Sequence, residues 1–460
     1  MVHTFQFRDD FLAYDTESQA LMMIDELTAE CLSLYDASGS SPTAERMARV
    51  ADDQDVSLAD VGQVCEEIDR LREDGYLFAP RVEVELSQLY PDRPVIKSMC
   101  LHICHDCNLR CRYCFAETGD FGTGRRGMLT VETGKKAIDF LIGHSAGRHH
   151  LDIDFFGGEP LLNWPVVEEL VAYCEERGRQ ADKDIRLTIT TNAVLLDQNK
   201  IDFINQHFKN CVLSLDGRPE VQNHMRPTAG GKGSYDVVVN NIVNFVRQRG
   251  EREHYVRGTF TRENLCFFED VKHMVDLGME QLSMEPVVAE DGCGYEIRME
   301  DLPTIYEEYE KLAEYNLATD FTEKAFNFFH FNIDLDGGPC LFKRLKGCGV
   351  GTEYCAVTPD GDIYPCHQFV GKTEFLMGNV HDNPLELKQT GTVDFTNLIL
   401  PQKDYCEDCW AKYYCSGGCP ANSYNATGSL LDQYEIGCLL MRKRMECALW
   451  LAARRMLRDQ

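Results

Sequence analysis

The chain has 460 residues, 44% of them hydrophobic, which is enough for about two to three domains with sizeable cores. Its 46 basic and 75 acidic residues give a formal net charge of −29. This charge argues against nucleic acid and anionic membranes as partners, because both are bound through Lys and Arg. No apolar run approaches the roughly 20 residues that span a bilayer, and the acidic N-terminus does not resemble a signal peptide, so we expect a cytoplasmic protein.

Twenty-one cysteines in a chain without a visible signal peptide indicate metal or redox chemistry rather than disulfides. Three of them form one spaced array and eight form a second pattern, both described below. Most of the others are expected to be small buried apolar residues.

Residues 1–85 are predicted to form a small module of three strands followed by three helices. Ser57 and Asp60 form a variant capping box at the start of the third helix. This order of elements resembles the winged-helix-like, PqqD-like modules that bind a leader peptide as an added strand on their sheet edge. A simple N-terminal cap on the next domain is the alternative interpretation. The expected strands are Thr4–Phe7, Phe11–Tyr14 and Ala20–Ile24, and the expected helices are Ala29–Tyr35, Ala44–Val50 and Leu58–Leu71.

Residues 90–300 alternate between apolar or β-branched runs and segments with helical spacing of apolar residues. Six strands joined by crossover helices predict parallel pairing, and hence an α/β fold with a partial (β/α)6 barrel. Active residues of such barrels lie at the C-terminal ends of the strands. The expected strands are Val95–Ile103, Leu151–Phe156, Ile185–Thr191, Cys211–Asp216, Tyr255–Phe260 and Gln281–Val288, and the expected helices are Val131–Ile142, Val166–Arg177, Gln198–His207, Tyr235–Arg249 and Phe267–Leu277.

Just after the first of these strands, Cys107, Cys111 and Cys114 form a C-x3-C-x2-C array, with Tyr113 before the last cysteine. Three thiolates on one loop can hold three irons of a [4Fe–4S] cluster and leave the fourth iron open for chemistry. The array resembles the signature of radical S-adenosylmethionine (SAM) enzymes. This implies that SAM binds the open iron and is cleaved to a 5′-deoxyadenosyl radical. Cys104 stands nearby, and as a fourth ligand it would close the cluster, but we expect it not to bind iron.

Gly157, Gly158 and Glu159 follow the second strand in the sequence FGGEP. Glycines at a strand end let the backbone approach a ligand closely, and a carboxylate there suits the ammonium group of methionine. One strand after the cysteine array, the sequence resembles the GGEP motif of radical SAM enzymes.

Polar residues also close or follow the later strands. By the same resemblance, Ser214 and Arg226 contact the ribose and carboxylate of SAM, and Val287 contacts the adenine through its backbone. Arg is suited to a bidentate contact with a carboxylate. Taken singly, each polar residue is equally compatible with a strand cap. The expected SAM contacts beyond the glycine motif and Tyr113 are Asn192, Ser214, Asp216, Arg226, Arg257 and Val287.

The last third of the chain is predicted to contain a helical bridge at residues 301–336 and a Cys-rich domain at residues 337–460. Within that domain, Glu353–Thr358 and Asp362–Pro365 flank a turn and predict a hairpin. A closing helix is expected at Tyr434–Met456.

Eight cysteines of this domain match, in order and spacing, the SPASM (auxiliary-cluster) extension of radical SAM enzymes. Spacing alone would also fit two zinc sites. The resemblance implies two further [4Fe–4S] clusters, three in all, whose ligands interleave along the chain. The first auxiliary cluster would be held by Cys340, Cys348, Cys366 and Cys419, and the second by Cys406, Cys409, Cys415 and Cys438.

Longer stretches, among them CHDCNLRCRYC and CEDCWAKYYCSGGCP, look like the maturases of six-cysteine (SCIFF) peptides. The resemblance implies an oxidoreductase of RiPP biosynthesis in the sactipeptide and ranthipeptide branch. Such enzymes install thioether cross-links between cysteine sulfur and a carbon of another residue. The implied partners are a Cys-rich precursor peptide with a leader and a one-electron donor such as flavodoxin or ferredoxin.

The nearest alternative is a dehydrogenase of the anaerobic sulfatase-maturase type, which oxidises Cys or Ser to formylglycine and shares both cysteine patterns. A nonenzymatic alternative, an iron–sulfur electron carrier or zinc scaffold, has no use for the GGEP sequence, Ser214 or Arg226.

Overall fold

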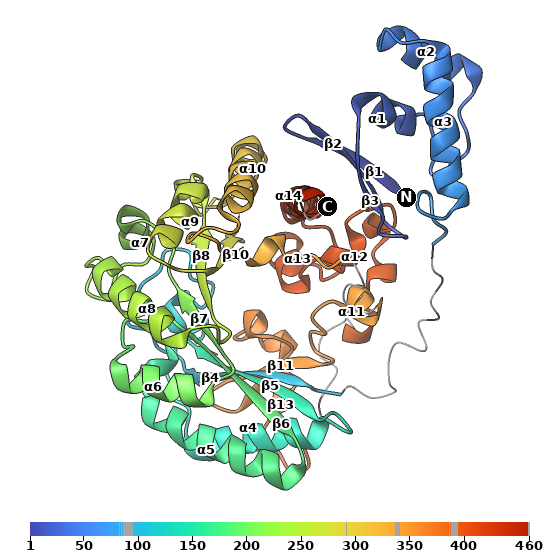
Figure 1. Cartoon of the computed structure of the whole chain (residues 1–460). Coiled ribbons are helices and arrows are strands. Elements are labelled where there is room, and N and C mark those ends of the chain that lie inside the picture. The colour runs from blue at the N-terminus through green and yellow to red at the C-terminus, as the bar shows by residue number, and fades with distance from the viewer. Residues whose placement is uncertain are drawn as a thin grey trace.

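The computed structural model describes residues 1–81, 83, 85, 95–290, 292–335, 341–385, 387 and 394–458, and its centre is a ten-stranded sheet. Six neighbouring strands of this sheet are parallel and follow one another in chain order, which confirms the predicted α/β class and partial barrel (Figure 1). They are β4 (Ser98–Cys104), β5 (His150–Gly157), β6 (Asp184–Thr191), β7 (Asn210–Ser214), β8 (Tyr255–Phe260) and β9 (Gln281–Pro286).

The five predicted crossover helices are present, and the helices that follow β4, β5 and β6 lie along the outer side of the sheet (Figure 1). A short helix, α7 (Pro219–Met225), was not predicted, because seven residues give too short a periodic pattern. The crossover helices are α4 (Val131–His144), α5 (Trp164–Ala181), α6 (Gln198–His207), α8 (Tyr235–Arg249) and α9 (Phe267–Asp276).

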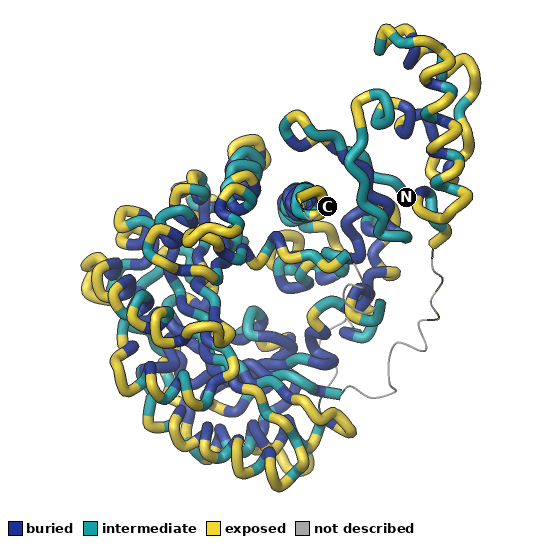
Figure 2. The backbone as a smooth tube through the Cα atoms, in the orientation of Figure 1, coloured by how far each residue is buried: buried dark blue, intermediate teal, exposed yellow. Residues whose placement is uncertain are grey.

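The alternation along β5 shows how the sequence orients this sheet. Leu151, Ile153 and Phe155 are fully buried in the main core, whereas Asp152 and Asp154 point to the opposite face. Successive side chains of a strand alternate between faces, so the apolar set packs on the helices and the polar set faces the barrel interior. In Figure 2 the strands are largely buried and the outer helices carry exposed positions on the solvent side.

In the segment expected to form a helical bridge, α10 (Leu302–Thr319) is helical, and β10 (Asn327–Phe328) adds a parallel strand beside β9. The predicted hairpin is confirmed as β11 (Tyr354–Val357) and β12 (Asp362–Tyr364). It also pairs in parallel with β4, so the C-terminal region continues the barrel sheet. Hydrogen-bonding partners this far apart in the chain are not visible in a local pattern.

The rest of the C-terminal region has little regular structure until its closing helix. β13 (Gly378–Asn379) extends the sheet beyond β12, and three short helices follow one another around the cysteines. No helix of the described ranges is long and apolar enough to cross a membrane. The helices are α11 (Leu341–Lys346), α12 (Lys412–Cys415), α13 (Pro420–Thr427) and the closing α14 (Glu435–Arg458).

The N-terminal module has the predicted three strands and three helices, with an antiparallel sheet of order β1-β2-β3 and a hydrophobic core of its own. The capping box is confirmed: Asp60 N–H donates to Ser57 Oγ and Ser57 N–H donates to Asp60 Oδ2, both at 3.2 Å. The elements are β1 (Val2–Phe7), β2 (Asp10–Asp15), β3 (Leu21–Ile24), α1 (Glu26–Ser33), α2 (Ala44–Asp53) and α3 (Leu58–Glu73).

The β1–β2 hairpin anchors this module to the rest of the protein. The Phe7 ring stacks on Trp450 of α14 with 4.0 Å between centroids, and Trp450 Nε1 donates to Asp10 at 2.7 Å. Arg8 forms an ion pair with Glu307 of α10 at 2.9 Å. Phe7 is therefore part of the main core, and the module is packed on the helices beside it (Figure 1).

Candidate active site and cysteine sets

The loop that carries the three-cysteine array is joined by backbone hydrogen bonds to the last residue of α7 and to the segment that follows it. The N–H of Arg110 donates to Pro227 O at 2.7 Å, and the N–H of Arg112 donates to Met225 O at 2.9 Å. This pairing brings Arg226, which is distant in sequence, beside the cysteines.

The structure brings Cys107, Cys111 and Cys114 together at the C-terminal end of the barrel strands. Burial is the largest cause that raises the pKa of Cys107 to about 12 and that of Cys111 to about 11, and the charge of Cys114 contributes to both values. Cys107 Sγ accepts hydrogen bonds from Leu109 N at 3.4 Å and from Asn192 Nδ2 at 3.6 Å. Iron would hold these thiols as thiolates, since a coordinated thiol is deprotonated.

The thiol of Cys104 is buried and bonded to backbone carbonyls. Its Sγ–H donates to Glu159 O at 2.9 Å and to Asp106 O at 3.3 Å, and burial raises its pKa to about 11. A thiol that bridges two backbone carbonyls ties the cysteine loop to the glycine motif. This supports the expectation that Cys104 does not bind iron.

Gly157 and Gly158 allow these two loops to approach each other. Gly157 has a φ of +126°, and a Cβ built on it would lie 2.3 Å from Cys104 O. A Cβ on Gly158 would lie 2.0 Å from Asp106 O, while its N–H donates to Cys104 O at 2.9 Å. The glycines therefore serve the contact between the two loops.

Gly158→Ala is expected to displace the cysteine loop, because a 2.0 Å contact with backbone cannot be relieved by rotating a side chain. We expect a loss of about 1–3 kcal/mol in the free energy of unfolding, and weaker SAM binding. Calorimetric unfolding and SAM titration measure the two effects. Gly230→Ala is the control, since its Cβ meets nothing within 4 Å. Wild-type SAM affinity in Gly158→Ala would show that the close approach is not needed.

The Glu159 carboxylate is buried and bonded to the end of β6. Its Oε1 accepts from Thr191 Oγ1 at 2.7 Å and from Leu161 N at 3.1 Å, and its Oε2 accepts from Asn192 N at 2.7 Å. Burial raises the pKa of Glu159, and these donors oppose the rise. Glu159 thus positions Asn192, whose amide reaches Cys107, a bracing role that the sequence did not predict.

Tyr113, Asp216 and Arg226 form a buried group beside Cys111. Tyr113 OH donates to both oxygens of Asp216, at 2.8 and 2.7 Å, and Arg226 Nη1 donates to Asp216 Oδ1 at 3.3 Å. Arg226 Nε is buried and has no hydrogen-bond partner among the residues that the structure describes. An open guanidinium donor fits an anionic group, which supports the expected contact with the carboxylate of SAM.

The remaining predicted SAM contacts lie on neighbouring strands. Ser214 is half-buried at the end of β7. Arg257 is on β8, with its Nη2 3.5 Å from the carboxylate of Glu285. Val287 is buried just after β9, and its N–H donates to Phe260 O at 2.9 Å, so the barrel already uses that amide.

Three members of the first predicted auxiliary set, Cys348, Cys366 and Cys419, come together near the β11–β12 hairpin. Burial raises the pKa of Cys366 to about 12, and the charges of Cys419 and Cys348 add to the rise. The N–H of Gln368 donates to Cys366 Sγ at 3.3 Å. Cys340, the fourth predicted member, lies outside the described residues.

The second predicted set, Cys406, Cys409, Cys415 and Cys438, also gathers in space. Burial is the largest cause that raises the pKa of Cys406 to about 12 and that of Cys415 to about 11, and neighbouring thiols of the set contribute to both values. Within the described ranges, no three His, Cys, Asp or Glu side chains converge closely enough to hold one metal ion. A [4Fe–4S] cluster takes one thiolate at each iron, so its four ligands lie farther apart than the ligands of a single metal ion.

Asp154, on the barrel-facing side of β5, was not predicted as a site residue. Burial raises its pKa to about 7, while Thr190 Oγ1, which donates to it at 3.2 Å, and the charge of Arg257 oppose the rise. The alternation of β5 could have placed Asp154 and Asp152 on one face. The sequence could not show which of the two is enclosed.

An aromatic contact joins the three-cysteine loop to the first auxiliary set. The ring of Phe115, which follows Cys114, lies 5.5 Å from that of His367, which follows Cys366. Phe156 of β5 lies 5.3 Å from the same imidazole. Cys114, Phe156 and Cys366 belong to one hydrophobic cluster, so apolar side chains fill the space between the two cysteine sets.

Two family models match this chain. The model of the radical SAM superfamily matches residues 101–274, which contain the three-cysteine array, the glycine motif and Arg226. The model of the SPASM iron–sulfur cluster-binding domain matches residues 348–410.

Curated relatives share the same regions at low identity. An uncharacterized protein of Methanocaldococcus jannaschii is 27% identical over 191 residues, which is 41% of this chain and 62% of that protein, less than two thirds of its length. The mycofactocin maturase MftC of Mycolicibacterium smegmatis is 25% identical over 76% of this chain and 84% of that protein. A cysteine-type anaerobic sulfatase-maturating enzyme of Clostridium perfringens is 24% identical over 68% of this chain and 85% of that protein.

Solved structures show the same fold. Native anSMEcpe with bound AdoMet has a TM-score of 0.61 at 18% identity, over 78% of this chain and 100% of that one. SuiB of Streptococcus suis bound to S-adenosylmethionine has a TM-score of 0.53 at 14% identity, over 95% of this chain and 98% of that one. The chain is therefore built from a radical SAM domain followed by a SPASM iron–sulfur domain, with SPASM-type maturases among its relatives.

Proposed function

We propose that this chain is a maturase that forms thioether cross-links in a ribosomally made Cys-rich peptide, of the six-cysteine (SCIFF) type. The observation that carries the proposal is the N-terminal module, in which β3 is one edge strand of a small sheet whose β1–β2 hairpin packs against the rest of the protein. An edge strand offers unpaired N–H and C=O groups to which a leader peptide can add as a further strand.

The coverage of the solved structures supports this choice of substrate. SuiB, which has been solved with its precursor peptide SuiA, covers 95% of this chain, whereas anSMEcpe covers 78%. The proposal includes three [4Fe–4S] clusters, a one-electron donor such as flavodoxin or ferredoxin, and a cytoplasmic location.

Different residues of the site would have different roles in the proposed reaction. Bound SAM and the clusters would supply a carbon-centred radical that removes one hydrogen atom from the acceptor carbon, and would take up one electron as the C–S bond forms. Arg226, held by Asp216 and Tyr113, would orient the carboxylate of SAM. Asp154 would accept the proton of the substrate thiol. Each cross-link thus removes one hydrogen atom from carbon and one proton and one electron from sulfur.

Mass spectrometry of a leader-bearing, Cys-rich peptide tests the proposal. The peptide is incubated anaerobically with reconstituted enzyme, SAM and a reductant. We expect the loss of two hydrogens for each cross-link, and the participating cysteines should no longer react with an alkylating reagent. Release of 5′-deoxyadenosine with an unchanged peptide would refute this substrate and retain the radical SAM chemistry.

A dehydrogenase of the sulfatase-maturase type is the second candidate, favoured by the 24% identical relative from Clostridium perfringens. Its product would be a formylglycine aldehyde, which reacts with hydrazide reagents, whereas a thioether does not. Labelling of the peptide product with a hydrazide probe therefore separates the two reactions.

Asp154→Asn is expected to lower the rate of cross-linking by about 10²-fold, which is the low end for removal of a general base. Because the pKa of Asp154 is raised to about 7, its proton-accepting carboxylate form increases as the pH rises through that value. The wild-type rate should therefore rise with pH near neutrality, and Asp154→Asn should lose this rise.

Initial rates of cross-linking, followed by mass spectrometry across this pH range, measure the effect. Asp152→Asn is the matched control, because Asp152 lies on the same face of β5 but pairs with Arg186 at 2.9 Å near solvent. An unchanged pH profile in Asp154→Asn would show that Asp154 does not accept the proton of the substrate thiol.

A further inference from the structure

Buried lysines in the described residues have carboxylate partners, with one exception. Lys403 is only 3% exposed, and no carboxylate of those residues lies within ion-pair distance of it. Its Nζ donates to the carbonyl oxygen of Gly417. A buried ammonium without a counter-charge is costly, so its surroundings have to supply negative charge in another form. The paired lysines are Lys346 with Glu353 at 3.2 Å, Lys412 with Glu17 at 2.9 Å and Lys443 with Glu310 at 2.5 Å.

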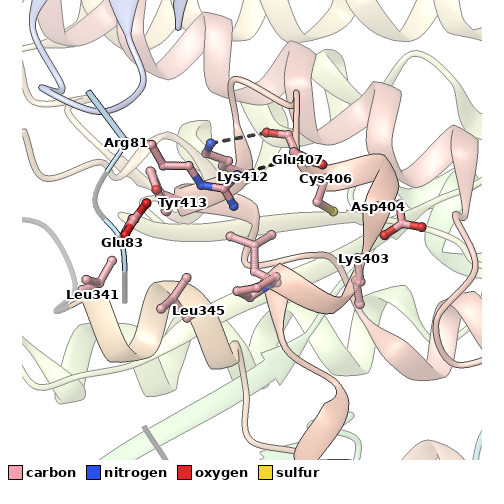
Figure 3. A pocket seen from close by; sticks show the side chains of 12 residues that line it. Arg81, Glu83, Leu341, Leu345, Lys403, Asp404, Cys406, Glu407, Lys412 and Tyr413 are labelled. Carbon is pink, nitrogen blue, oxygen red and sulfur yellow. Dashed lines mark hydrogen bonds and ion pairs between the residues drawn. The ribbon is translucent and has the colours of Figure 1, made fainter. Parts of the chain in front are cut away.

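Cysteines of both auxiliary sets lie close enough to Lys403 to act on its ammonium, and Asp404 and Glu407 line the same pocket. Burial lowers the pKa of the Lys403 ammonium, and nearby thiols oppose this. Lys403 and Cys406 both line a pocket of about 450 Å³. Their side chains are labelled in Figure 3. The charge of Lys403 opposes the rise in pKa that burial causes in five cysteines, which are Cys348 and Cys419 of the first set, and Cys406, Cys415 and Cys438 of the second.

Gly417 fixes the lysine stem in this position. A Cβ on Gly417 would lie 3.1 Å from Cδ of Lys403, and its φ of +82° favours glycine. Gly417 lies between Cys415 and Cys419, which belong to different sets. The ammonium is therefore held against the short segment that connects the two sets.

We propose that Lys403 is a fixed positive charge shared by the two auxiliary clusters, which raises the reduction potential of both. The inference rests on the proposed assignment of these cysteines to clusters. An iron–sulfur cluster becomes more negative on reduction, and a buried cation stabilises that state more than the oxidised one. The electron released when the C–S bond forms would thereby pass more readily to these clusters. The cation also reduces the repulsion between two anionic clusters.

Redox titration followed by electron paramagnetic resonance tests this inference in the full-length chain with Cys107, Cys111 and Cys114 changed to Ala. In that chain only the auxiliary clusters contribute to the spectrum. We expect Lys403→Met and Lys403→Gln to shift the reduction potentials of both auxiliary clusters to more negative values by at least about 59 mV. This shift corresponds to a tenfold change in a one-electron equilibrium constant. Lys403→Arg, which keeps the charge, should stay close to the parent.

Two comparisons separate charge from packing. Gln at position 403 keeps a hydrogen-bond donor for Gly417, so a shift shared by both neutral variants measures the lost charge. The double variant Glu17→Gln with Lys412→Met removes a buried ion pair of no net charge from the same region and should shift neither potential. A shift confined to Lys403→Met would overturn the inference.

Iron and sulfide are quantified in every variant. Full iron loading with unchanged potentials in both neutral variants would overturn the role of Lys403 and leave the proposed function intact. A parent chain without iron at the auxiliary cysteines would overturn both.

Discussion

Cys111→Ala is expected to abolish SAM cleavage, with 5′-deoxyadenosine release falling by more than about 1,000-fold, because no side chain replaces chemistry that the cofactor carries. Cys111 sits between the other two thiols of the array and beside the buried Arg226. Without it, only two thiolates remain on the loop, so the cluster loses one of its three attachments.

Cys104→Ala is the matched control for this result. Cys104 lies three residues before Cys107, but its thiol donates to backbone carbonyls, so its removal should cost about 1–3 kcal/mol of stability and leave SAM cleavage in place. Chromatographic assay of 5′-deoxyadenosine, with iron counted per chain, measures both variants. Equal losses of activity and iron would show that the ligand assignment is wrong.

Removal of iron is expected to unfold α11 and residues 400–433, which contain α12 and α13, while the barrel and the β11–β12 hairpin stay folded. The region has one small hydrophobic cluster to itself, made of Leu345, Leu400, Cys406 and Tyr413, and Cys406 is itself a predicted ligand. Metal binding contributes about 10 kcal/mol or more in small metal-dependent domains, which is comparable to the whole stability of a typical domain. The iron–sulfur clusters would therefore be the main interaction that holds the short segments of this region together.

Hydrogen exchange followed by mass spectrometry, before and after anaerobic chelation, measures this effect by segment. The β11–β12 hairpin should keep its protection, because β11 pairs with β4 in the central sheet. Helix α4 serves as an internal control within the barrel. Native protection throughout residues 400–433 after full loss of iron would contradict the expectation.

The sequence predicted the barrel closely wherever a long periodic pattern was present. Tyr255–Phe260 and Gln198–His207 were predicted with the bounds that the structure has. The first barrel strand begins at Ser98 rather than Val95. The short strand β10 and helix α7 were missed, because two and seven residues carry too little pattern for a local rule.

The site was predictable where spacing along the chain carries the information, as in the three-cysteine array. The partners of Glu159 and the surroundings of Lys403 depend instead on which segments pack together. Nothing in the sequence singles out Lys403, because most lysines are solvated. Only its burial next to Gly417 distinguishes it.

The pairing of β4 with β11 has a consequence for synthesis of the chain on the ribosome. Lys97 and Glu353, which meet beside this pairing, are 256 residues apart. At about 5–20 residues per second, the edge of β4 that β11 later covers stays open for roughly 10–50 s after β4 has emerged. An open edge of buried apolar residues invites pairing with other chains. The nascent barrel therefore passes through an aggregation-prone interval that ends only when the C-terminal region arrives.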